Sequence, residues 1–316
     1  MRHSTLEKYV QGTIPGELIN INDNLRFLPL TTPELRKGSG REIRSRGLRV
    51  LNRFFRKGLL QVVGSPWLPG FYTLKAEEAV LVPPAILNQG RTCKMLLCIT
   101  SGPVEASPWY SFEGDPMMVL RVRDEWKSFE NYMASFKQKY RQRIKKAMKD
   151  NAALEVREVV LGGAVREELG YMLNRSLKDR VVALPADTTQ LLSLYEQCFS
   201  SHYKIWAFYK GEAIHGFISV LEDGPVLRAM HFASNEDAPD GFYTRAMMKV
   251  VEHGILGGFA EINLGRTATE IKSTYGAEPR ENYFSFYSSA RTTRLLLAAI
   301  AKRYRPKSYI IRSPFK

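Results

Sequence analysis

The segment from residue 204 to residue 233 constrains the fold more than any other part of the sequence. Three apolar runs, Lys204 to Tyr209, Ala213 to Leu221 and Val226 to Ala233, are separated by two turns, Lys210-Gly211-Glu212 and Glu222-Asp223-Gly224. Short turns that contain glycine, placed between runs of this length, predict strands joined as hairpins. We therefore expect a three-stranded antiparallel run in the C-terminal half of the chain.

The segments around this run alternate between helix and strand patterns. From Trp126 to Lys149, apolar residues recur at steps of three and four, which predicts one long helix with a core face and a basic face. A helix from Tyr243 to Ile255 and strands from Glu261 to Leu264 and from Asn282 to Tyr287 are expected after the antiparallel run. The other elements predicted for this half are a strand at Leu154–Val160, helices at Val165–Lys178 and Asp187–Phe199, and a closing basic helix at Arg291–Tyr304.

The N-terminal half has weaker patterns. Residues 1–32 are expected to be an irregular lead-in, a basic helix is expected to follow, and residues 101–115 are expected to form a loop. A helix over Lys75–Leu81 should break or restart at Pro83-Pro84, because proline is tolerated only in a first turn. Strands are predicted at Leu59–Val63, Lys94–Thr100 and Met117–Val122. The predicted domains are an N-terminal α/β domain, residues 1–124, and a C-terminal domain, residues 125–316.

The composition is that of a globular protein with a sizeable core. Of the 316 residues, 44% are hydrophobic and 25% are charged. The longest apolar run, Leu295 to Ala301, has seven residues, and the first residues lack the apolar segment of a signal peptide. The three cysteines form no metal-type cluster. We therefore expect a cytoplasmic protein with no metal and no permanently bound cofactor.

Positive charge is the strongest bias in the composition. The formal net charge is +14, and the cations gather between residues 34 and 57, between Lys137 and Lys149, and after Glu281. Charge of this size attracts polyanions such as RNA or the anionic inner surface of a membrane. Solvated helix faces would give the same pattern, so both interpretations stay open.

The stretch Glu261–Ala277 joins a strand, a glycine break at Gly265 and a short helix that a threonine can cap. Arg266 stands at the corner between strand and helix, and Lys272 lies on the helix. Loops at strand ends are where α/β proteins place their chemistry. Arg266 and Lys272 are therefore predicted to be exposed toward a cleft and to bind an anionic part of a substrate.

Two motifs resemble a known family. Tyr140-Arg-Gln-Arg-Ile-Lys-Lys-Ala147 is similar to the R-x-x-I-x-K-A signature of FemABX-like acyltransferases. Leu264-Gly-Arg-Thr and Ile271-Lys-Ser-x-x-Gly-Ala277 resemble a second segment of the same group. Residues 125–290 thus resemble the FemABX-like branch of the GNAT superfamily of N-acyltransferases. The resemblance implies an α/β (α+β) fold with a GNAT-like mixed, mostly antiparallel sheet flanked by helices. It also implies a tandem of two GNAT-like units, in which residues 1–124 are a degenerate first copy.

The resemblance implies an N-acyltransferase that moves an acyl group from acyl-CoA to an amine. Many such enzymes carry a Q/R-x-x-G-x-G/A loop whose amides bind the pyrophosphate of coenzyme A, and here Ala233–Thr244 stands in that place. A helix start can still bind phosphate through free amides and its dipole. Acids in the same loop, Glu236, Asp237 and Asp240, would repel it. The residues predicted to bind acyl-CoA are Gly241, Tyr243, Thr244 and Arg245.

The transfer requires an amine to lose a proton and an oxyanion to be stabilised. The predicted catalytic residues are His231, Glu236 and Tyr275. His231 is equally explained as a half-buried strand residue, and Tyr283 as a core residue of an aromatic strand. The residues predicted to bind the substrate are Arg266, Lys272, Tyr283, Arg141 and Lys145.

Two alternatives stay open beside acyl-CoA-dependent transfer. Some FemABX-type enzymes take an aminoacyl group from aminoacyl-tRNA and deliver it to a cell-wall precursor or a peptide, and the missing loop leaves this donor open. The second alternative is a non-enzymatic protein that binds RNA or a membrane surface on a GNAT scaffold, because basic faces contact phosphates without reading a sequence.

Overall fold

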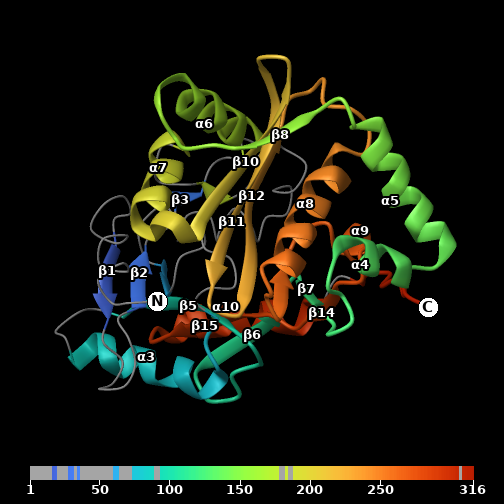
Figure 1. The fold of residues 1–316 in the computed structure, drawn as a ribbon. Helices are drawn as coiled ribbons and strands as arrows, with labels where there is room; N and C mark the ends of the chain where they lie inside the picture. Colours follow the sequence, from blue (N-terminus) through green and yellow to red (C-terminus); the bar gives the residue numbers. More distant parts are fainter. Residues whose placement is uncertain are drawn as a thin grey trace. The chain divides into compact units, whose positions relative to one another are not determined.

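The computed structural model describes residues 16–19, 28–31, 34–35, 60–63, 73–88, 93–177, 182–183, 188–305 and 308–316 (Figure 1). The chain forms two compact units. The first comprises Met1–Asp115, Leu177–Asp187 and Glu281–Ser308, and the second comprises Pro116–Ser176, Thr188–Arg280 and Tyr309–Lys316. Both units are therefore built from segments that are distant in the sequence.

The first unit contains a six-stranded sheet. Its strand order is β1 (Gly16–Ile19), β2 (Leu28–Thr31), β4 (Leu60–Val63), β5 (Met95–Thr100), β15 (Tyr283–Ser288) and β6 (Trp109–Glu113). Only β4 and β5 are parallel neighbours; the other described pairs are antiparallel. Strands β3 (Glu34–Leu35) and β9 (Val182–Ala183) form a separate pair. The strands predicted near β4 and β5 are confirmed, whereas most of the predicted basic helix after residue 32 lies outside the described residues.

The strand predicted at Asn282–Tyr287 is confirmed as β15, which lies between β5 and β6. Two other expectations for this unit were wrong. Residues 101–115 were expected to be a loop, but they contain β6. Helix α3 (Ala76–Asn88) continues through Pro83 and Pro84 instead of breaking there. Val82, Pro83 and Ile86 are buried, so apolar packing holds the helix although the prolines remove two backbone donors.

The second unit contains a seven-stranded sheet. Its strand order is β14 (Glu278–Arg280), β7 (Met117–Arg121), β13 (Glu261–Asn263), β12 (Val226–Ser234), β11 (Ala213–Asp223), β10 (Tyr203–Lys210) and β8 (Glu155–Glu158). The predicted antiparallel run is confirmed as β10, β11 and β12. Strands β12 and β13 are parallel neighbours, and the other pairs are antiparallel. This sheet is the mixed, mostly antiparallel one that the resemblance implied.

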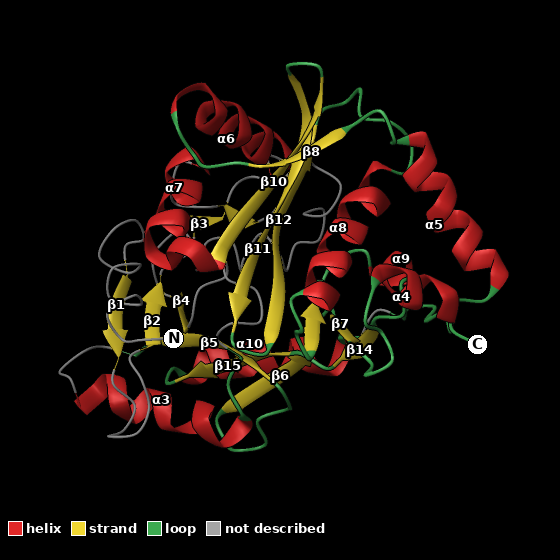
Figure 2. Ribbon diagram, in the orientation of Figure 1, coloured by secondary structure: helices red, strands yellow, loops and turns green. Residues whose placement is uncertain are grey.

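Helices lie on both sides of β12 (Figure 2). Phe232 packs against Phe242 and Tyr243 of α8 (Phe242–Leu256). The preceding residue, His231, stacks on Tyr195 of α7 (Thr188–Phe199), with ring centroids 5.4 Å apart. Neighbouring strand residues point to opposite faces, so α7 and α8 cover opposite faces of the sheet. The remaining helices of this unit are α4 (Phe129–Ser135), α5 (Gln138–Asp150), α6 (Gly163–Leu177) and α9 (Thr269–Ser273).

The helix predicted from Trp126 to Lys149 is two helices, α4 and α5, so that prediction was wrong. Phe136 and Lys137 between them have extended ψ angles of 144° and 145°. Phe136 forms a β-bridge with Phe315, and its ring packs on the Phe315 ring at 4.8 Å. The C-terminal segment therefore pairs with backbone groups that would otherwise have continued the helix. The periodicity of residues 126–149 contains no information about this pairing.

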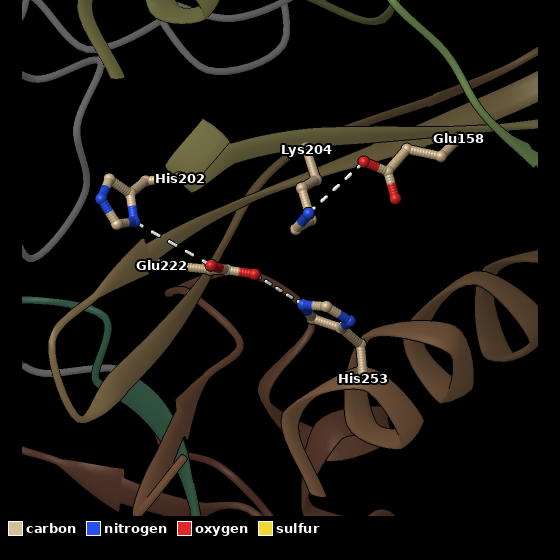
Figure 3. Close-up of polar contacts among 5 residues, drawn as sticks. All are labelled: Glu158, His202, Lys204, Glu222 and His253. Carbon is tan, nitrogen blue, oxygen red and sulfur yellow. Dashed lines mark hydrogen bonds and ion pairs between the residues drawn. The ribbon is translucent and has the colours of Figure 1, made fainter. Parts of the chain in front are cut away.

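Polar side chains tie α8 to the strands near its C-terminal end (Figure 3). His253 of α8 lies 2.8 Å from a carboxylate oxygen of Glu222 on β11, and His202 lies 4.0 Å from the other oxygen. Beside them, Lys204 of β10 pairs with Glu158 of β8 at 3.4 Å. The His253 ring also packs edge-on against the buried Trp206. These contacts fix the C-terminal end of α8. Its N-terminal end contributes to the site described next.

Candidate functional site

The second unit contains a pocket of about 350 Å³. Its walls come from α5, from α8, from α9 with the residues that follow it, and from the C-terminal segment. The lining residues are Tyr140, Arg143, Ile144, Thr244, Glu270, Ile271, Thr274, Tyr275 and Arg312. The stretch Glu261–Ala277, in which the sequence predicts a substrate-binding corner, therefore contributes a wall of this pocket.

The strand order explains why space exists here. Strands β12 and β13 pair over only three residues, Val226–Arg228 with Glu261–Asn263. Strand β12 continues to Ser234, whereas the chain turns away after β13. Gly265 makes this turn with a φ of +81°, and its N–H donates to Oδ1 of Asn263 at 2.9 Å. The predicted strand, glycine break and short helix are confirmed, and the turn directs α9 toward the pocket.

Two hydroxyl groups form the inner end of the pocket. Tyr275 is 1% exposed, and its hydroxyl lies 2.8 Å from Oγ1 of Thr244. Burial raises the pKa of Tyr275 to about 12, although the hydrogen bond with Thr244 acts in the opposite direction. The phenol is therefore protonated at neutral pH and can donate a proton but not accept one. Tyr132 donates to the backbone oxygen of Tyr275 at 2.8 Å and holds the residue in place.

Three charged side chains form the outer part of the pocket: Arg143, Glu270 and Arg312, all exposed. None of them forms an ion pair with another residue in the part of the chain that the structure describes. The backbone N–H of Arg312 donates to Oγ of Ser273 at 3.0 Å, so the C-terminal segment is fixed against α9. The pocket thus combines two free cations and one free carboxylate around a partly apolar interior.

The predicted catalytic residues do not come together. His231 lies within a bulge of β12, because Ala229 pairs with Val220 and Phe232 with Ile218, which leaves two residues of β12 opposite one of β11. Its ring faces α7, on the face of the sheet away from Phe232 and α8. Glu236 is 89% exposed at its side chain and pairs with Arg175 at 3.7 Å. Of the three predicted catalytic residues, Tyr275 alone lines this pocket.

The residues predicted to bind acyl-CoA also lie in different surroundings. Thr244 lines the pocket. Gly241, which precedes α8 with a φ of +76°, lies against α5, since a Cβ at this position would be 2.9 Å from Cβ of Ala147. Tyr243 is largely buried, and burial raises its pKa. The Arg245 guanidinium lies 3.7 Å from the sulfur of Met148, and burial lowers its pKa.

The predicted substrate-binding residues lie in different surroundings. Lys272 is only 2% exposed, so the expectation that it is exposed toward a cleft was wrong. Its side chain points back into the turn, where Nζ lies 3.7 Å from the Cβ position of Gly265. Arg266 is half-buried in the same turn. Arg141 and Lys145 are on α5 but do not line the pocket, and Tyr283 lies in β15 of the first unit.

Among the charged residues that line the pocket, Glu270 and Arg312 were not predicted as site residues. Arg143 belongs to the basic face of α5, for which the sequence predicts anion contact, and it lies near Tyr140 and Ile144 on the helix. Glu270 and Arg312 carry no such signal, because their approach depends on where the C-terminal segment packs. No helix within the described ranges is long and apolar enough to cross a membrane. Among these same residues, no group of three or more metal-ligating side chains could hold a metal ion.

No protein-family model matches the sequence. No curated protein matches it either. Solved structures do match. The C-terminal domain (DUF2156) of a protein described as a candidate lysylphosphatidylglycerol synthetase from Agrobacterium fabrum matches with a TM-score of 0.53 and 11% identity, over 94% of this chain and 91% of that chain. The L-PGS structure from Bacillus licheniformis matches with a TM-score of 0.53 and 10% identity, over 95% of both chains. A FemX structure matches with a TM-score of 0.49 and 9% identity, over 90% of both chains. Together with the sheet order, the first two matches confirm the expected GNAT-like fold.

Proposed function

We propose that this protein is an acyltransferase that moves an aminoacyl group from an aminoacyl-tRNA to an amine. Its fold is that of acyl- and aminoacyl-transferring proteins. The name of one matching protein, a candidate lysylphosphatidylglycerol synthetase, describes the joining of a lysyl group to an acceptor. The transfer proposed here exchanges an ester for an amide, which is a favourable direction for the reaction.

The observation that carries this choice of donor is the close approach of α5 to one side of the α8 start, where Asp240 and Gly241 keep exposed surface on the other side. A pyrophosphate at that helix start would need open space beside its free amides. Instead, Cβ of Ala147 lies 2.9 Å from the Cβ position of Gly241, and Nδ2 of Asn151 donates to the backbone oxygen of Asp240 at 2.9 Å. Asp237 and Asp240 add negative charge nearby. These features favour a donor other than acyl-CoA.

The hydroxyl of Tyr275 supports the chemistry of the proposed transfer. The amine nitrogen attacks the ester carbonyl carbon, and the C–O bond to the ribose oxygen of the tRNA then breaks. The amine loses one proton to solvent, and the ribose oxygen gains one. A phenol that is protonated at neutral pH can supply the proton that the ribose oxygen gains, and the phenolate then recovers a proton from solvent; Thr244 at 2.8 Å can orient the hydroxyl. Free cations at the pocket, Arg143 and Arg312, attract the phosphates of the donor.

Transfer assays with two donors test this proposal. The purified protein is incubated with a mixture of aminoacyl-tRNAs that carry labelled amino acids, and separately with labelled acetyl-CoA, each with a set of amine acceptors. We expect labelled amide product from the tRNA donor alone. Product from acetyl-CoA alone would reverse the choice of donor and return the function to acyl-CoA-dependent N-acyl transfer. Absence of product from both donors, with folded protein, would favour a binding protein on a GNAT-like scaffold.

A further inference from the structure

The three charges at the pocket form no ion pair with any residue in the described ranges, and together they form a pattern that few donors complement. Arg143 lies on α5, Glu270 on α9 and Arg312 on the C-terminal segment, yet all three line the same pocket. Arg143 and Arg312 attract an anion, whereas the carboxylate of Glu270 attracts a cation. A matching ligand therefore carries a phosphate and an ammonium group close together.

The end of an aminoacyl-tRNA carries these two groups. Its ribose is linked to a phosphate, and its α-ammonium is separated from the ester carbonyl by one carbon atom. Acyl-CoA carries phosphates but, for a simple acyl chain, no cation beside its carbonyl. The arginines are therefore compatible with both donors, whereas Glu270 is compatible with the aminoacyl donor alone.

The acceptor amine is a weaker candidate for Glu270. A nearby carboxylate raises the pKa of an ammonium group because it favours the charged form. An acceptor amine must be uncharged to attack, so an ion pair with Glu270 would slow the reaction. An ammonium group that does not react, such as the α-ammonium of the donor, can form the same ion pair without slowing the reaction. The chemistry thus assigns Glu270 to the donor.

We propose that the pocket binds the aminoacyl end of the donor, with the α-ammonium on Glu270 and the terminal phosphate on Arg143 and Arg312. This inference rests on the proposed function and adds a recognition subsite to it. The carbonyl then lies toward the inner end of the pocket, where Tyr275 and Thr244 place their hydroxyls. Glu270 selects a donor with a free α-amine, whereas none of these three residues recognises the side chain of the amino acid.

Calorimetry with two probes tests the subsite. The first probe is an amide-linked alanyl-adenosine phosphate, which mimics the donor end but cannot transfer its acyl group. The second is the same compound acetylated on its α-nitrogen, which removes the positive charge. We expect the wild-type protein to bind the first probe about tenfold more tightly than the second, equivalent to about 1.4 kcal/mol. Glu270→Gln should reduce this preference to about twofold or less.

Matched variants separate the subsite from general charge effects. Glu278→Gln removes an exposed carboxylate on β14 that does not line the pocket, so it should keep the wild-type preference. Arg143→Gln with Arg312→Gln should weaken both probes by a similar factor, because both probes keep the phosphate. An unchanged preference in Glu270→Gln, or no binding of either probe to folded wild-type protein, would overturn the subsite.

Failure of the subsite and failure of the proposed function give different results. If aminoacyl-tRNA supports transfer but the probes are not distinguished, the donor assignment stands and the assignment of Glu270 falls. If no aminoacyl-tRNA supports transfer, the proposed function falls whatever the probes show. N-acetylated aminoacyl-tRNA gives a matched kinetic measurement, since Glu270→Gln should slow transfer from the free-amine donor and leave transfer from the acetylated donor unchanged.

Discussion

Tyr275 places one hydroxyl where the proposed reaction needs a proton. Replacing Tyr275 with phenylalanine keeps the ring that packs in the core and removes only the group bonded to Thr244. We expect Tyr275→Phe to lower the transfer rate by about a hundredfold or more, as for loss of general acid catalysis. The melting temperature should fall by only a few degrees, since about one hydrogen bond is lost. Full activity in single-turnover assays would exclude this role.

The same hydroxyl gives a pH dependence of stability. Burial raises the pKa of Tyr275 from 10.0 to about 12, so the folded state keeps the proton longer than the unfolded state does. The contribution of Tyr275 to stability is fully present below pH 10 and is lost as the pH rises to about 12. Urea unfolding across this range should show a steeper loss of stability in the wild type than in Tyr275→Phe. Equal slopes would mean that the phenol is not buried as described.

Lys272 and Arg266 should now behave differently from each other. Both were expected to be exposed, but Lys272 is 2% exposed and Arg266 is half-buried. Lys272→Ala removes a buried side chain, so we expect it to destabilise the protein by about 2 kcal/mol or more. Lys272→Met should recover part of that loss because it restores the apolar stem. Arg266→Ala should shift the urea midpoint by less than half as much; a larger shift for Arg266→Ala than for Lys272→Ala would contradict this assignment.

Two residues chosen from the sequence, Thr244 and Tyr275, line the candidate pocket, and their roles stay predictions. Thr244 lies at a helix start, where free amides bind anions, whereas the burial of Tyr275, which is 1% exposed, does not follow from its place beside a glycine. His231 also follows a local rule, yet strand alternation turns its ring toward α7. Arg312 depends on where a terminal segment packs, which no local pattern encodes.

Helix α5 carries further cations that do not line the pocket. Lys139, Lys145 and Lys149 are exposed, whereas Lys146 pairs with Asp150. Replacing the three exposed lysines with glutamate should weaken tRNA binding in filter assays and reduce its salt slope by about two, because each lost phosphate contact removes about 0.7 to 0.9 from the slope. Stability should change little, as expected for exposed charges.

A matched control for α5 is available on α10 (Arg291–Arg303). Replacing exposed Arg291, Lys302 and Arg303 with glutamate changes the net charge by the same amount on another element. We expect this variant to keep most of the tRNA affinity. Equal weakening by the two sets of substitutions would show that net charge, and not the α5 surface, attracts the RNA.

Helices and strands could be predicted where the local sequence determines the structure. They could not be predicted where contacts with a distant segment determine it. Apolar runs, turns that contain glycine and the spacing of apolar residues are enough to predict strands β10, β11 and β12 and helix α8. The break between α4 and α5 requires Phe315, which lies far along the chain from Phe136. Strand β15 has an ordinary strand pattern, but its partners, β5 and β6, lie far earlier in the chain.

At the scale of the whole molecule, each sheet depends on a strand from the other half of the sequence. The boundary expected between residues 124 and 125 leaves β7 (Met117–Arg121) in the N-terminal part, although β7 lies between β13 and β14. The same boundary leaves β15 in the C-terminal part, although it lies between β5 and β6. The domain boundary between residues 124 and 125 stays a prediction from sequence, and the strand order raises the question whether residues 125–316 fold without β7.

Two fragments that differ by nine residues test this point, since 116–316 contains β7 and 125–316 lacks it. Without β7, the edge of β13 loses its antiparallel partner, and the buried residues Met118 and Leu120 leave the core. Burial of such side chains contributes about 1.5 to 3 kcal/mol each, a large share of the stability of a domain. We expect fragment 125–316 to lack a cooperative urea transition, while fragment 116–316 keeps one and protects the amides of β13 from hydrogen exchange. Cooperative unfolding of fragment 125–316, with protected β13 amides, would show that the C-terminal half folds without β7.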